Sequence, residues 1–85
     1  MKTFKYTITD PQGMHARPAG ELVKKANEYK SSIMIDKAGK QADAKRIFAV
    51  MSLGVKQGEE VEVSIEGEDE ETALEEINEF FKEKF

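Results

Sequence analysis

The 85-residue sequence contains no cysteine and only one histidine. Without cysteine there is no disulfide and no thiolate nucleophile, and one histidine is too few for a structural zinc site, which takes about four nitrogen or sulfur ligands. No apolar run approaches the roughly 18 residues of a membrane span, and the N-terminal residues lack the apolar core of a signal peptide. These absences predict a soluble, cytoplasmic protein without a metal site and without membrane insertion.

Acidic residues are concentrated in the last third of the chain. Residues 1–58 contain 11 Lys and Arg against 5 Asp and Glu, whereas residues 59–85 contain 2 against 12. The two parts carry +6 and −10, which together give the formal net charge of −4. The basic part predicts a surface that attracts acidic partners. A sequence pI near 5.0 argues against binding to nucleic acid.

The spacing of apolar residues predicts an α+β fold in one domain, residues 1–85. Val61, Val63 and Ile65 alternate with polar residues, so their strand has one face in water. Such strands indicate a two-layer open-faced β-sandwich, with a four-stranded antiparallel sheet and three helices on one face, in the order β-α-β-β-α-β-α. Strands are expected at 3–9, 32–36, 41–44 and 58–67, and helices at about 16–28, 46–53 and 69–85.

The only histidine, His15, lies in the segment GMHARPAG at residues 13–20. Pro18 suits the first turn of a helix, because its missing N–H would have no intrahelical partner there. His15 or Ala16 is therefore expected at or beside the N-cap, where free N–H groups and the helix dipole attract phosphate. Arg17 adds donors that match phosphate oxygens. A neutral imidazole at such a site is a competent nucleophile toward a phosphoryl group.

A simpler interpretation is that His15 only caps the helix and that Arg17 is an ordinary surface charge. It accounts for Pro18. It does not account for the arginine beside the histidine, nor for a histidine where Ser, Thr, Asp or Asn would cap the helix better.

The segment at 13–19 resembles the active-site signature of HPr, the histidine-containing phosphocarrier family of the bacterial phosphoenolpyruvate-dependent sugar phosphotransferase system. The family pattern G-[L/I/M]-H-[A/T]-R-P-A is matched in full. The segment AKRIFAVMSLGVKQG at 44–58 is similar to the second motif of the family, and the length and the element order agree over essentially the whole chain.

The resemblance implies that His15 accepts a phosphoryl group on Nδ1 from Enzyme I and passes it to IIA domains of sugar permeases. Arg17 would stabilise the phosphate, with Ala16 and Pro18 beside it at the helix N-terminus. The protein would be a stoichiometric carrier and not an enzyme with its own turnover, and no cofactor is implied. A monomer is the simplest expectation for so small a carrier.

The helix expected at 46–53 is apolar on almost every side. Val50 and Leu53 are expected to face the sheet, which leaves several large apolar side chains partly exposed, as in a docking surface. In the family this helix lies beside the active-site helix, and both contact the partners. The predicted docking residues are Gly20, Lys24, Arg46, Ile47, Phe48 and Met51. Arg17, Lys25 and Lys45 are further candidates for attracting acidic partners.

Arg46 departs from part of the family. In low-GC Gram-positive members, the first residue of this helix is a serine that a dedicated kinase phosphorylates. Arg46 cannot be modified in that way, so we expect this regulation to be absent. Two alternatives remain open. One is a phosphocarrier of a nitrogen-related regulatory branch, which would use the same site. The other is an HPr-like regulatory binding module, which is disfavoured because such modules replace the histidine.

Overall fold

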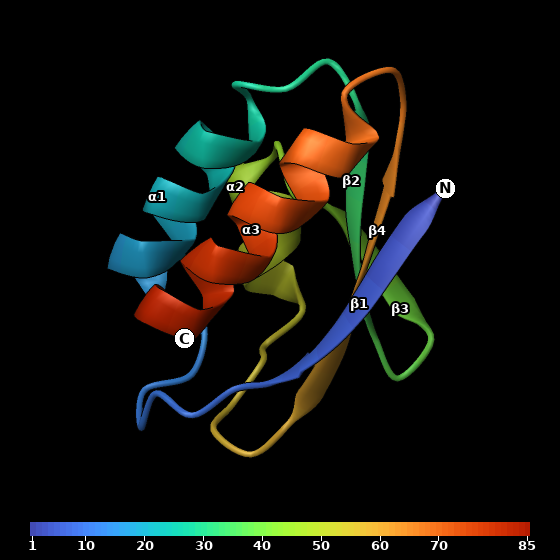
Figure 1. The fold of residues 1–85 in the computed structure, drawn as a ribbon. Coiled ribbons are helices and arrows are strands. Elements are labelled where there is room, and N and C mark those ends of the chain that lie inside the picture. The colour runs from blue at the N-terminus through green and yellow to red at the C-terminus, as the bar shows by residue number, and fades with distance from the viewer.

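The computed structural model describes all residues, 1–85, and contains the seven expected elements in the expected order (Figure 1). Each element lies close to its predicted position. The strands are β1 (Lys2–Thr7), β2 (Ser32–Lys37), β3 (Lys40–Asp43) and β4 (Glu60–Glu66), and the helices are α1 (Ala16–Ala26), α2 (Ile47–Ser52) and α3 (Glu70–Lys84).

The four strands form one antiparallel sheet in the order β1-β4-β2-β3. β4, the last strand in the sequence, therefore lies between β1 and β2, and Val63 is paired with Phe4 on one side and with Ile35 on the other. All three helices cover one face of the sheet, and the other face is open (Figure 1). The α+β open-faced sandwich is confirmed, whereas the strand order was not predictable from the sequence pattern.

The hydrophobic core lies between the sheet and the helices. Val61, Val63 and Ile65 of β4 are buried, as their alternation predicted. Leu22 of α1 and Ile77 of α3 are fully buried as well. These residues recur at strand or helix spacing on one face of their element, so burying that face joins the two layers.

A cluster of aromatic rings joins α3 to β1. The ring of Phe81 is fully buried and packs edge-on against Phe4 and Tyr6, with centroid separations of 5.6 and 5.7 Å. It also lies 5.3 Å from the ring of Phe85. Edge-to-face packing at these separations is favourable because the positive edge of one ring meets the negative face of another.

Asp69 occupies the N-cap position of α3, but its side chain makes no capping hydrogen bond. Instead its carboxylate accepts the backbone N–H groups of Lys30 and Ser31, each at 2.9 Å, and the hydroxyl of Ser31. The Ser31 hydroxyl is the main cause of a pKa for Asp69 below its ordinary value. The buried Ser31 thereby gains a partner, and the loop after α1 is attached to the start of α3.

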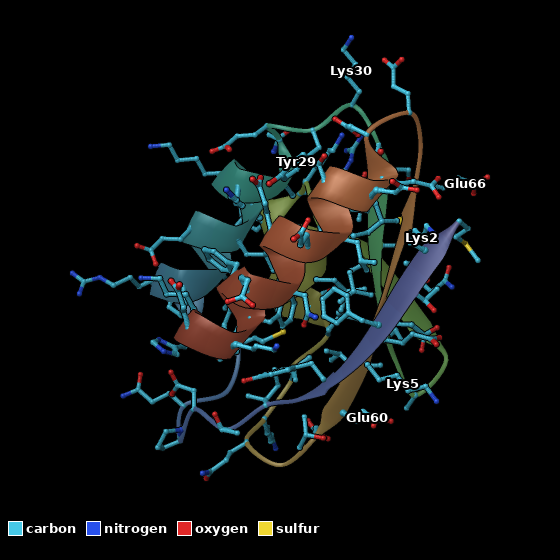
Figure 2. All side chains as sticks on the ribbon, viewed as in Figure 1. Lys2, Lys5, Tyr29, Lys30, Glu60 and Glu66 are labelled. Atoms are coloured by element: carbon cyan, nitrogen blue, oxygen red, sulfur yellow. The ribbon has the colours of Figure 1, made fainter.

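Charged side chains lie on the surface of β1 and β4. Lys2, Lys5, Glu60 and Glu66 extend from β1 and β4 at the surface (Figure 2). On the open face Lys5 is paired across the strands with Glu62, an arrangement of opposite charges that favours this register. None of the helices is both long and apolar enough to cross a bilayer.

Two phenylalanines with opposite exposure give a matched test of this core. Phe81→Ala removes a fully buried ring and is expected to lower the free energy of unfolding by about 3–5 kcal/mol. Phe48 is 87 % exposed, so Phe48→Ala is expected to change it by no more than about 0.5 kcal/mol. Urea denaturation followed by circular dichroism measures both. Similar losses in the two variants would contradict this account of the core.

Candidate functional site

The site begins where the chain enters α1. His15 is the N-cap residue, with extended backbone angles of φ −80° and ψ 172°, and its carbonyl oxygen accepts the Ala19 N–H at 3.0 Å. Its side chain makes no capping bond. The expectation that His15 or Ala16 lies at or beside the N-cap is therefore confirmed, and Pro18 lies in the first turn, where it is buried.

Two backbone donors remain free at this helix end. Pro18 has no N–H, and the Ala19 N–H is used by His15, so the unpaired N–H groups of the first turn are those of Ala16 and Arg17. Both residues are exposed, and the Arg17 guanidinium has no carboxylate within ion-pair distance, whereas Arg46 lies 3.8 Å from Asp43. The helix end therefore presents two amide donors, a dipole and an unpaired cation, which together suit a phosphate.

The imidazole of His15 lies beside a carboxylate that the sequence analysis did not single out. Its Nε2 is 3.3 Å from Oδ2 of Asp10, and the His15 and Asp10 side chains are 33 % and 25 % exposed. Oδ1 of Asp10 accepts the backbone N–H of Gln12 at 2.8 Å. This backbone contact is the main reason that the pKa of Asp10 lies below its ordinary value, and His15 contributes to the same shift. The carboxylate is thus ionised near neutral pH.

The sequence carries only a weak signal for Asp10. It opens the segment DPQG, which is typical of a turn, and five residues separate it from His15. A turn folds the chain back on itself, so an acidic residue just before a turn and a histidine just after it are candidates for contact. Only the turn geometry shows that the two side chains meet.

The loop before α1 is held against the segment after α2. The Met14 N–H donates to the Val55 carbonyl oxygen at 3.1 Å, and the Met14 side chain is buried. Gly13 has φ +67°, and a Cβ there would lie 2.3 Å from the same oxygen. Only glycine satisfies both conditions without strain. The glycine that opens the signature is therefore required to place His15.

The residues predicted to form a docking patch lie on α2 and on the neighbouring α1 (Figure 1). Val50 and Leu53 are buried, as expected. The large apolar side chains that α2 leaves accessible are Phe48, 87 % exposed, and Met51, 38 % exposed. Ile47 is half-buried and packs against the core. Gly20 of α1 is exposed, with no atom within 4 Å of the position that a Cβ would take.

The basic residues near this patch divide into two groups. Arg17, Lys24 and Arg46 are exposed. Lys45 instead donates to the carbonyl oxygen of Tyr29 at 2.8 Å. Lys25 lies 3.7 Å from both Glu28 and Glu76, and it also lies over the ring of Tyr29. These two lysines stabilise the end of α1 and are not free charges, which corrects the broader set that the sequence suggested.

Arg46 was predicted to be the first residue of the helix, but α2 begins one residue later. Arg46 is therefore the N-cap residue of α2, and its side chain makes no capping bond. The turn before it is organised by Asp43, whose Oδ1 accepts the Lys45 N–H at 2.9 Å and whose carbonyl oxygen accepts the Arg46 N–H at 3.1 Å. Because Asp43 satisfies these donors, the N-cap side chain is free to face solvent.

A small α+β sandwich that presents a half-exposed histidine, free amides and an unpaired arginine at one helix end belongs to the class of phosphoryl-group carriers. Residues 2–83 match the family model described as the PTS HPr component phosphorylation site. The chain is 47 % identical over 75 residues to the phosphocarrier protein HPr of Lysinibacillus sphaericus, covering 88 % of this chain and 85 % of that protein.

Solved structures of similar sequence have the same fold. HPr from Thermoanaerobacter tengcongensis matches with a TM-score of 0.94 at 41 % identity, covering 100 % of this chain and 96 % of that one. Crh, a catabolite repression protein of Bacillus subtilis, matches with a TM-score of 0.78 at 38 % identity over 99 % and 97 % of the two chains. This chain belongs to the HPr family, and it is a phosphocarrier protein of the phosphotransferase system.

Two glycines of the site region should respond to alanine in opposite ways. Gly13→Ala forces a Cβ against Val55 in a left-handed conformation, and we expect it to lower the free energy of unfolding by about 2 kcal/mol or more. Gly20→Ala places a better helix former at an open position and is expected to raise it by up to about 1 kcal/mol. Thermal unfolding compares the stability of each variant with that of the wild type. Wild-type stability for Gly13→Ala would show that the loop does not require glycine.

Proposed function

We propose that His15 carries the phosphoryl group on Nδ1, receiving it from Enzyme I and passing it to IIA domains of sugar permeases. The observation that carries this proposal is the unequal surroundings of the two ring nitrogens. Nε2 faces Asp10 at 3.3 Å, whereas Nδ1 has no hydrogen-bond partner in the protein. No side-chain nitrogen or oxygen is both buried and unpartnered, so Nδ1 is accessible from outside.

The chemistry is a transfer between two imidazoles. The Nδ1 lone pair forms a bond to phosphorus while the bond from phosphorus to the donor nitrogen breaks and its electron pair returns to the donor ring. The incoming phosphoryl oxygens are negative. In this proposal they are held by the free N–H groups of Ala16 and Arg17, the helix dipole and the Arg17 guanidinium. Catalysis of such a transfer depends mainly on positioning and electrostatic stabilisation.

The docking surface in this proposal lies on α1 and α2. The exposed side chains of Phe48 and Met51, together with Ile47 and the open position at Gly20, supply an apolar contact area for both partners in turn. Lys24 and Arg46 are exposed and supply positive charge at its border. Charges at the border of an interface raise the rate of association with acidic partners more than they raise affinity.

The same proposal excludes regulation by phosphoserine at position 46, because Arg46 occupies the N-cap position and has no hydroxyl to modify. It also describes a monomer. His15, Asp10 and Arg17 come from one short segment, so a single copy contains the whole site. Among the relatives, Crh is a domain-swapped dimer, and an HPr dimer is known from Thermoanaerobacter tengcongensis. A nitrogen-related branch would use the same atoms of this chain with other partners.

Incubation with Enzyme I, phosphoenolpyruvate and magnesium tests the carrier site. Intact mass measured without acid should show a single acid-labile phosphoryl adduct on the wild type and none on His15→Ala, because only His15 offers an accessible imidazole. Adding a purified IIA domain should remove the adduct. An adduct that persists in His15→Ala, or no adduct when the same Enzyme I phosphorylates another HPr, would contradict the proposal.

The docking surface is tested by placing a charge on it. We expect Phe48→Glu to raise the KM for transfer from Enzyme I about tenfold, because a charged group must be desolvated at an apolar contact. Thr72→Glu is the matched control, since it adds the same charge at an exposed position of α3. Stopped-flow measurements of phosphoryl transfer, made at increasing salt concentration, give the KM of both variants. Equal KM values in the two folded variants would place the docking surface elsewhere.

A further inference from the structure

Asp10 is held in place more firmly than an ordinary turn residue. Its backbone N–H donates to the carbonyl oxygen of Phe85 at 2.9 Å, and its carbonyl oxygen accepts the Gly13 N–H at 2.9 Å. Its Oδ1 accepts the Gln12 N–H at 2.8 Å. These contacts leave Oδ2 as the one oxygen directed at His15.

The segment around Asp10 is also attached to two distant parts of the chain. The Thr9 hydroxyl donates to the Phe85 carbonyl oxygen at 2.9 Å, and the Gln57 side chain donates to the Thr9 carbonyl oxygen at 3.2 Å. The end of α3 lies beside the segment that leads into α1 (Figure 1). The position of the carboxylate is therefore set by tertiary contacts as well as by its own turn.

We propose that Asp10 is a positioning residue for phosphoryl transfer: its carboxylate keeps the proton of the neutral His15 ring on Nε2 and so leaves the Nδ1 lone pair available to phosphorus. A carboxylate accepts hydrogen bonds and does not donate them, so an imidazole nitrogen 3.3 Å away is favoured as the N–H form. A neutral imidazole has one N–H, and the other nitrogen then carries the lone pair. This inference rests on the proposed carrier role of His15 and extends it.

The same contact assists the transfer step itself. When the Nδ1 lone pair forms the bond to phosphorus, the ring gains positive charge, and the Nε2–H proton stays where it is. The bond between phosphorus and the donor nitrogen breaks, and no proton is exchanged with Asp10. The carboxylate stabilises the positive ring, as a buried aspartate stabilises the imidazolium in a catalytic triad. Asp10 acts from the preceding loop at Nε2, and Nδ1 is the nitrogen that takes the phosphoryl group.

The tautomer is measured on the protein alone, so the outcome does not depend on any partner. Nitrogen-15 NMR of the His15 ring, at a pH where it is neutral, should show mainly Nε2–H in the wild type. Asp10→Asn keeps an oxygen that can accept the Gln12 N–H, but its amide can donate to Nε2 and should shift the population toward Nδ1–H. Asp36→Asn is the matched control, because Asp36 accepts the Gly39 N–H in a turn remote from His15.

Transfer kinetics with phosphorylated Enzyme I provide the second measurement. We expect Asp10→Asn to lower the rate constant for phosphorylation on the order of tenfold, with Asp10→Ala less affected because alanine does not impose the wrong tautomer. Asp36→Asn should transfer at the wild-type rate. Circular dichroism confirms that each variant is folded, and if Asp10→Asn does not fold, the wild-type tautomer and Asp10→Ala still decide the question.

A predominantly Nδ1–H wild type would overturn the proposal, and so would folded Asp10 variants with unchanged tautomer and rate. Failure of the carrier role has a different signature, since the wild type itself would then take no phosphoryl group on His15. A normal adduct on wild type with an Asp10-independent tautomer refutes only the role of Asp10.

Discussion

The contact between the chain before α1 and the chain after α2 organises the functional end of this molecule. The Met14 N–H donates to the Val55 carbonyl oxygen, and Gly13 lies so close to that oxygen that no side chain fits. This one contact places the start of α1 next to the end of α2. As a result the half-exposed His15 and the exposed Phe48 are presented by neighbouring elements of a rigid scaffold, although more than thirty residues separate them in the sequence.

Positive and negative side chains are distributed unevenly over the molecule. Exposed positive charge lies on α1 and at the start of α2, at Arg17, Lys24 and Arg46, of which Arg46 lies 3.8 Å from Asp43. Most of the acidic residues lie on β4 and α3. An acidic partner is therefore attracted to one side and repelled from the other, which favours encounters in the orientation that transfer needs. A carrier that must bind and release two partners in turn benefits from steering more than from tight binding.

The helix end that is proposed to bind phosphate is assembled from very few groups. Pro18 removes one amide, and Ala19 uses His15 as its acceptor, so the two remaining N–H groups are those of Ala16 and Arg17. Asp10 adds a negative charge beside the ring and faces the nitrogen of His15 that is not proposed to carry phosphate. In the proposed site, Arg17 and the helix end serve the phosphoryl oxygens, and the Asp10 carboxylate serves the imidazole ring.

The sequence alone determined the elements and the central residues of the site. Helical and strand spacing depend on hydrogen bonds and faces within a few residues, so the α1 and β4 patterns and the phosphate-attracting surroundings of His15 follow from local physics. Only the tertiary structure decided that β4 lies between β1 and β2, that Asp69 binds the Ser31 loop instead of capping α3, that Lys45 is occupied, and that Asp10 meets Nε2. Each of these depends on how loops close and which backbone donors remain free after packing, which no local pattern encodes.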